Sequence, residues 1–184
     1  MYILKHFRTV AKHRRAVRKG CFAVGLYRQG LTHDLSKYSP TEFGAGIRYY
    51  QGTRSPNSRE RELFGYSKAW MHHKGRNKHH FEYWTDLNPK TRRYEPVPMP
   101  RRYLAEMVMD RIAACKTYYG RDYKDGDALE YLEHSQEARE SSMMHPQTKR
   151  ELVFLLTMLR DQGEKETYHF IREVVLKNKP FAEE

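Results

Sequence analysis

The stretch LTHDLSKYSPTE, residues 31–42, ends one predicted helix and begins the next. Ser39-Pro40-Thr41-Glu42 has the pattern of a capping box with proline at the first helical position, which favours a helix start. Just upstream, His33 and Asp34 offer an imidazole nitrogen and a carboxylate oxygen on consecutive residues. Both can bind one cation where the backbone leaves a helix. The stretch therefore predicts a metal site at a helix junction.

Upstream of this junction, residues 2–19 have the apolar spacing of an amphipathic helix, with His13 on the stripe that faces the core. We expect this helix to end at Gly20. The apolar run CFAVGLY, residues 21–27, then predicts a second helix that leads to the His-Asp pair. His13 alone is most simply a core histidine, and only its place in the order of histidines favours a ligand role.

Downstream, Asn57 and Glu60 predict the start of a helix that continues to about His73 and stops at Gly75. The segment KHHFEYW, residues 78–84, reads as a short second piece. The Pro-rich segment DLNPKTRRYEPVPMP, residues 86–100, reads as a long surface loop of the kind often found over a site.

The next predicted helix covers residues 101–119, between Pro100 and Gly120. Its periodicity places Asp110 on an apolar stripe with Met107 and Ala114. An unpaired buried carboxylate is costly, so Asp110 needs a cation partner, either a metal ion or an arginine of the first helix. Asp110 is thus a candidate site residue.

Three further helices are predicted over residues 127–142, 146–162 and 164–178, with Gly163 separating the last two. We find no convincing strand alternation and no internal repeat. The expected fold class is all-α, with one domain over residues 1–184 that consists of a core at about 5–120 and a helical extension at about 121–184.

Composition narrows the class of protein. A chain of 184 residues can bury roughly 70% of its unfolded surface, so no disulfide or structural zinc is required. Cys21 and Cys115 lack CxxC spacing, which favours a reducing, cytoplasmic location. No signal peptide or membrane span is apparent, so we expect a soluble protein. The net charge of +11 would attract nucleotides, phosphate esters or nucleic acid.

Taken together, His13, His33-Asp34 and Asp110 resemble the H…HD…D signature of the HD-domain superfamily of metal-dependent phosphohydrolases. The string HDLSK is also similar to the HDxxK form common there. The resemblance covers about residues 5–120. It implies an HD-like helical bundle in which these four residues bind one divalent ion, either Mn, Fe, Co, Ni, Mg or Zn.

Histidines between the His-Asp pair and the last Asp resemble a two-metal branch of the superfamily, in which the Asp34 position bridges two ions. The candidates are His73, His79 and His80, with His72 as a further possibility. Neighbouring residues on a helix point about 100° apart, so the members of a doublet do not easily face one ion, and two of the four can be surface residues.

The resemblance implies a hydrolase that acts on a small, nucleotide-like phosphate ester through metal-activated water, with Asp34 and Lys37 as catalytic residues. Lysine offers a point charge to phosphate and arginine a planar bidentate contact. Candidates for phosphate binding are Lys37, Arg76, Arg92, Arg93, Arg101 and Arg102.

Two alternatives stay open. The same metal ligands occur in diiron oxygenases of the HD type, which cleave C–C or C–P bonds. The chain can also be a basic nucleic-acid-binding protein without catalysis, in which the histidines are structural and binding has a steep salt dependence. In that case Trp70, Tyr83 and Trp84 would be candidates for stacking on a base, although aromatic residues near helix ends are more often core residues.

Overall fold

The computed structural model describes residues 2–52, 54–134 and 143–181, and it is mainly all-α, as predicted. A two-stranded antiparallel sheet is the exception within these residues. In chain order the elements are α1 Tyr2–Ala23, α2 Tyr27–Thr32, the 3-10 turn η1 Leu35–Tyr38, α3 Pro40–Arg48, α4 Pro56–Phe64, α5 Lys68–Lys74, the 3-10 turn η2 Phe81–Tyr83, β1 Thr85–Leu87, β2 Tyr94–Pro96, α6 Arg101–Tyr119, the 3-10 turn η3 Gly120–Asp122, α7 Asp127–His134, α9 Pro146–Phe170 and the π-helical turn η5 Ile171–Val175.

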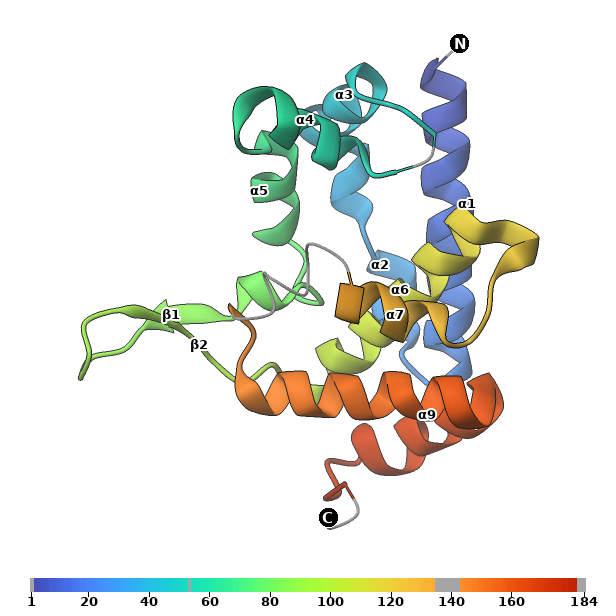
Figure 1. The fold of residues 1–184 in the computed structure, drawn as a ribbon, viewed down its shortest axis with the longest axis vertical. Helices are drawn as coiled ribbons and strands as arrows, with labels where there is room; N and C mark the ends of the chain where they lie inside the picture. The colour runs from blue at the N-terminus through green and yellow to red at the C-terminus, as the bar shows by residue number, and fades with distance from the viewer. Residues whose placement is uncertain (1, 53, 135–142, 182–184) are drawn as a thin grey trace.

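The first helix is longer than predicted, because Gly20 does not end it. A Cβ atom at Gly20 would lie 2.8 Å from the sulfur of Met109, so this glycine allows α1 to approach α6 closely. The chain turns instead at Gly25, which has a φ of 89° that favours glycine. α1 consequently packs along α6 through Gly20 and returns into α2 (Figure 1).

The helix predicted over residues 57–73 is two helices. Gly65 ends α4 with a left-handed φ of 78°, and Ser67 starts α5 by accepting a hydrogen bond from the Trp70 N–H. The start of α4 is also earlier than expected, since Ser55 rather than Asn57 is its cap. The predicted start of α3 is confirmed, because the Ser39 hydroxyl accepts the Glu42 N–H.

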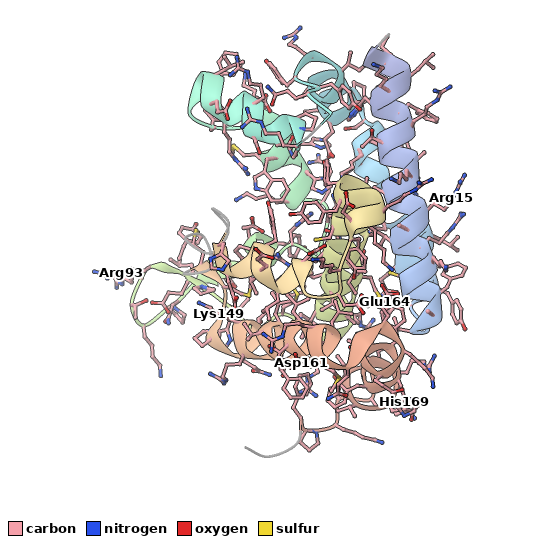
Figure 2. The ribbon with its side chains drawn as sticks, turned by 45° about the vertical axis from the view of Figure 1, so that its right-hand side comes forward. Arg15, Arg93, Lys149, Asp161, Glu164 and His169 are labelled. Carbon is pink, nitrogen blue, oxygen red and sulfur yellow. The ribbon has the colours of Figure 1, made fainter. Side chains whose placement is uncertain are left out.

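The segment 86–100 is not an unstructured loop over a site. β1 and β2 pair antiparallel with Leu87 opposite Tyr94, and the Asn88 side chain accepts the N–H of Lys90 in the turn. The hairpin projects sideways from the helices, with Arg93 near its far end (Figures 1 and 2). The prediction failed because the paired strands are only three residues long, too short for an alternation pattern.

The hydrophobic core is centred on α6, which is buried on most of its sides rather than along one stripe. α1, α7 and α9 surround it in one cluster of buried side chains. The described helices after residue 121 are therefore part of the same core, to which α9 contributes four leucines that are 0% exposed: Leu152, Leu155, Leu156 and Leu159. In Figure 1, α9 crosses the lower end of the molecule.

α7 and α9 begin at Asp127 and Pro146, as predicted, whereas the last helix, predicted to residue 178, is α-helical to Phe170 and continues as η5 to Val175. Gly163 has φ 78° and ψ 175° and kinks α9 at the predicted position. The helix predicted over 127–142 is present as α7 to His134, and its remaining part lies outside the described residues. Among the described helices, none combines the length and the apolar character needed to cross a membrane.

Candidate metal centre

The first group of candidate ligands consists of His13, His33, Asp34 and Asp110, and the structure brings all four together. His13 comes from α1 and Asp110 from α6, while His33 and Asp34 follow the last turn of α2. Asp34 has a left-handed φ of 52°, and its side chain is buried. Nε2 of His13 lies 2.9 Å from Asp110 Oδ1, and Nε2 of His33 lies 3.4 Å from the same oxygen.

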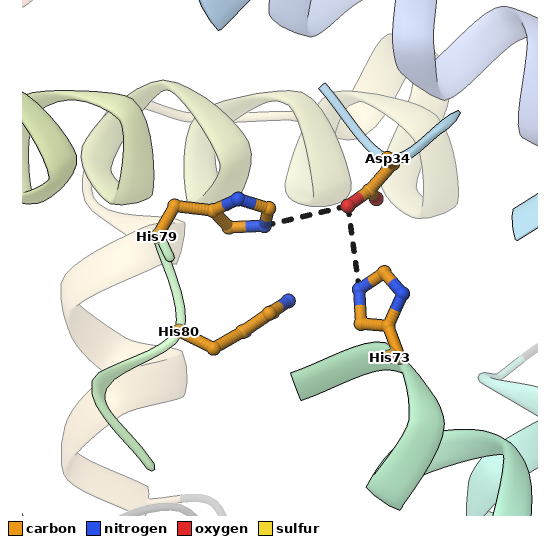
Figure 3. A group of neighbouring side chains, drawn as sticks. All are labelled: Asp34, His73, His79 and His80. Carbon is orange, nitrogen blue, oxygen red and sulfur yellow. Dashed lines mark ion pairs between the residues drawn. The ribbon is translucent and has the colours of Figure 1, made fainter. Parts of the chain in front are cut away.

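The second group consists of Asp34, His73, His79 and His80. His73 lies in the last turn of α5, and turns over residues 75–78 then bring His79 and His80 beside it. In Figure 3 the rings of His73 and His79 form ion pairs with the Asp34 carboxylate, and the His80 ring lies between them and points the same way. The amide of Asn77 donates to the His73 carbonyl at 2.8 Å and thereby holds these turns.

Asp34 belongs to both groups, and its two oxygens face different histidines. Oδ2 lies 3.3 Å from His33 Nε2 and 3.8 Å from His13 Nε2. Oδ1 lies 3.3 Å from His73 Nε2 and 3.5 Å from His79 Nε2. The side chain is 1% exposed. A carboxylate in this position is able to bridge two cations.

The donor set fits divalent ions. Two ligand atoms that each lie about 2.1 Å from one ion at tetrahedral or octahedral angles are roughly 3.0–3.4 Å apart. The distances above are close to this range. Six buried ligand atoms also lack a hydrogen bond of acceptable geometry, which is costly for the five that no charged group other than a cluster member pairs with. The sixth, Asp34 Oδ2, pairs with the Lys37 ammonium group at 2.7 Å. The six atoms are His13 Nε2, His33 Nε2, Asp34 Oδ1, Asp34 Oδ2, His79 Nε2 and His80 Nε2.

Glu106, which the sequence did not indicate, supports histidines of both groups from behind. Its Oε1 accepts a hydrogen bond from His33 Nδ1 at 2.9 Å and forms an ion-pair contact with His79 Nδ1 at 3.2 Å. When Nδ1 carries the proton, Nε2 keeps the lone pair that a metal needs. Glu106 precedes Asp110 by one helical turn on α6, and this i, i+4 spacing is the signal that could have identified it.

Glu42 supports His73 in the same way and explains the position of His72. Its Oε2 accepts from His73 Nδ1 at 2.7 Å, and its Oε1 accepts from His72 Nδ1 at 2.6 Å. His72 is therefore directed at Glu42, and it belongs to neither group of candidate ligands. The sequence indicated Glu42 only as the capping residue of α3, a role that gave no hint of this contact.

Electrostatics in the cluster favour charged carboxylates. Burial opposes ionisation of Asp34, but His33, Lys37 and His73 outweigh it and hold its pKa well below the usual value. The pKa of Asp110 is likewise well below its usual value, because His13 and His33 outweigh burial. Burial next to His79 and His73 keeps the pKa of His80 well below its usual value. Burial opposes protonation of His33, but Asp34, Asp110 and Glu106 outweigh it and raise its pKa well above the usual value. Because ionised carboxylates and neutral imidazoles are the forms that bind metals, an ion at His33 would replace a proton.

A cavity of about 370 Å³ opens beside the cluster and is lined by His13, His73, His80 and Asp110. Lys37 also lines it, with its ammonium group 2.7 Å from Asp34 Oδ2. A candidate substrate site thus lies directly against the candidate ligands. Trp70 forms part of the same wall, where its ring packs on His73 and His80.

The arginines that the sequence suggested for phosphate binding lie outside the lining of this cavity. Arg76 is exposed and donates to the His72 carbonyl. Arg101 pairs with Glu151 of α9 at 2.7 Å, and Arg102 is exposed on α6. Arg92 and Arg93 lie in the hairpin. The arginines that do line the cavity are Arg54 and Arg111, neither of which the sequence indicated.

The model of a family of unknown function, DUF5662, matches residues 2–158. This range includes every candidate ligand described above. No curated protein and no solved structure matches the chain.

Proposed function

The chain belongs to the DUF5662 family, whose function is unknown, and we propose that it is a divalent-metal-dependent phosphohydrolase with a two-metal centre. The observation that carries this proposal is the position of Asp34, whose two oxygens face separate groups of buried histidines. The same ligands, in the same order along the chain, also support the resemblance to the HD-domain superfamily.

The first ion would be held by His13, His33, Asp34 and Asp110, and the second by Asp34, His73, His79 and His80. When bound, such ions lower the pKa of a coordinated water and neutralise charge on a phosphoryl group. Nitrogen and carboxylate oxygen donors suit Mn, Fe, Co, Ni and Zn, and Mg suits a site richer in oxygen.

The cavity supplies the remaining requirements of phosphate ester hydrolysis. Lys37 and Arg111 line the same cavity as the candidate ligands Asp110 and His80. They therefore place positive charge in the cavity beside the candidate metal centre. We propose that Lys37 orients a phosphoryl oxygen of the substrate toward the centre. The side chains of Trp70 and Phe81 form part of the wall and limit access of bulk water. A small phosphate ester is therefore the proposed substrate class.

The test is hydrolysis of p-nitrophenyl phosphate and bis-p-nitrophenyl phosphate by protein reconstituted with each of the six metals. We expect metal-dependent release of p-nitrophenol that is lost in His33→Ala and Asp34→Asn. His169→Ala is the matched control, since His169 is an exposed histidine of α9, remote from the cluster. Wild-type activity that survives in His33→Ala and Asp34→Asn would contradict the proposal.

A diiron oxygenase is the second candidate, because the second group offers three imidazoles and a carboxylate, a ligand set that also suits iron. Anaerobic reconstitution with Fe(II) distinguishes the two functions. The oxygenase requires two irons per chain and consumes O₂, whereas the phosphohydrolase releases p-nitrophenol without O₂.

A further inference from the structure

Glu106 contacts a histidine of each group, His33 of the first and His79 of the second. Among the described residues that are not themselves candidate ligands, it is the one carboxylate that does so. We propose that Glu106 is a positioning residue shared by the two metal sites and that it couples their filling. This inference rests on the proposed two-metal centre. It adds that loss of Glu106 weakens both sites together, whereas loss of Glu42 weakens one.

The contacts of Glu106 use a single oxygen. Oε1 lies 2.9 Å from His33 Nδ1 and 3.2 Å from His79 Nδ1, and the two rings are 4.3 Å apart between centroids. Glu106 is 5% exposed, so bulk water has little access to this oxygen. Both rings are consequently held by one acceptor, and their Nε2 atoms turn toward Asp34 at 3.3 and 3.5 Å.

Glu106 is better described as a hydrogen-bond acceptor than as a ligand of a third ion. Its oxygen and the Nδ1 atoms of His33 and His79 lie close enough together to hold a cation. A neutral imidazole, however, has one lone pair, because its other nitrogen carries the proton. Since both Nε2 atoms face Asp34, the protons belong on Nδ1, where Glu106 accepts them.

Glu42 provides the natural comparison, because it supports a ligand of the second group alone. Its Oε2 accepts from His73, and its Oε1 accepts from His72, which belongs to neither group. Glu42 is also buried, at 7% exposed. Two buried glutamates with the same chemistry thus differ in the number of metal sites that they support.

The coupling follows from this shared contact. An ion bound to His33 orients that ring and, through it, the Glu106 carboxylate that holds His79. By linkage, the factor by which the first ion raises the affinity for the second equals the factor by which the second raises the affinity for the first. Replacement of a group that orients metal-binding histidines weakens metal binding by roughly 10- to 100-fold. In Glu106→Gln this loss should appear at both sites.

The experiment is a titration of metal-free protein with Mn²⁺, in which free Mn²⁺ is followed by its EPR signal. Glu106→Gln keeps the shape of the side chain and removes its charge. We expect wild type to bind two Mn²⁺ ions. Glu42→Gln should bind one ion with unchanged affinity and the other more weakly. Glu106→Gln should bind both ions about 10- to 100-fold more weakly. Glu106→Leu, which has no acceptor, should lose more than Glu106→Gln.

Glu60→Gln is the matched control, because Glu60 is a buried glutamate that accepts from Ser67 and Ala69 away from the cluster. We expect it to lower the thermal midpoint of the metal-free protein without changing either Mn²⁺ affinity. If Glu106→Gln weakens one site or none while wild type binds two ions, the shared role is wrong and the two-metal proposal stands. If wild type binds neither Mn²⁺ nor any other divalent ion, the shared role and the two-metal proposal are both wrong.

Discussion

Replacement of Asp34 by asparagine should abolish the stabilisation of the protein by divalent ions. Asn has the shape of Asp and tolerates the left-handed backbone at this position, where φ is 52° and ψ is 29°. Asp34→Ala would be a poorer test, because the same backbone would cost about 1–2 kcal/mol for alanine. Asp34→Asn therefore removes the bridging charge with little change of shape.

The size of the effect follows from the number of sites that share Asp34. An ion present at 100 times its dissociation constant stabilises the folded protein by about 2.7 kcal/mol. Two ions give about 5 kcal/mol, and in a chain of this length each kcal/mol shifts the thermal midpoint by about 2–4 °C. We expect a rise of roughly 10–20 °C for wild type when Mn²⁺ is added.

The assay is thermal unfolding of the metal-free protein with increasing Mn²⁺, and the quantity compared is the rise in midpoint for each variant. A change in the stability of the metal-free state therefore cancels. Asp34→Asn should show a rise close to zero, because both sites lose their shared ligand. A rise in Asp34→Asn equal to that of wild type would refute the argument that Asp34 serves both sites.

Three further predictions concern the scaffold and its pH dependence. A Cβ atom at Gly46 would lie 2.1 Å from His6 Nε2. Gly46→Ala should therefore lower the free energy of unfolding in urea by about 1–3 kcal/mol. His6→Ala in the double variant should relieve the clash and restore part of this loss. Gly163→Ala should also cost about 1–3 kcal/mol, because φ 78° with ψ 175° is accessible essentially only to glycine; an unchanged midpoint would contradict this. In metal-free protein, the pKa values of Asp34 and Asp110 are well below 3.8. The stability that their ionised forms contribute is therefore full above about pH 5 and is lost as pH falls through the folded-state pKa values. Urea midpoints that stay level from pH 5 to pH 3 would contradict this prediction.

The all-α class and the positions of several helix ends were predictable because they depend on local chemistry. Ser39 and Gly75 act over a few residues of chain, and the sequence contains everything that their roles require. Gly20 was assigned wrongly because its role depends on Met109, which lies far away in sequence. Only the packing of α1 on α6 distinguishes a glycine that ends a helix from one that lets two helices approach.

The candidate ligands were predictable to a similar extent. The order His13, His33-Asp34, Asp110 indicated a site from residue types alone, whereas the choice among four histidines depended on the turns after Gly75. Those turns bring His73, His79 and His80 to one carboxylate and leave His72 on Glu42. Glu42 and Glu106 were missed, because a carboxylate that supports a histidine from behind resembles any helical glutamate in sequence.

The most direct test of the two-metal centre is a crystal structure of the protein grown or soaked with Mn²⁺, analysed for anomalous scattering. We predict two peaks, one on each side of the Asp34 carboxylate, the first among His13, His33 and Asp110 and the second among His73, His79 and His80. A single peak, or a carboxylate of Asp34 that contacts no peak, would contradict the account.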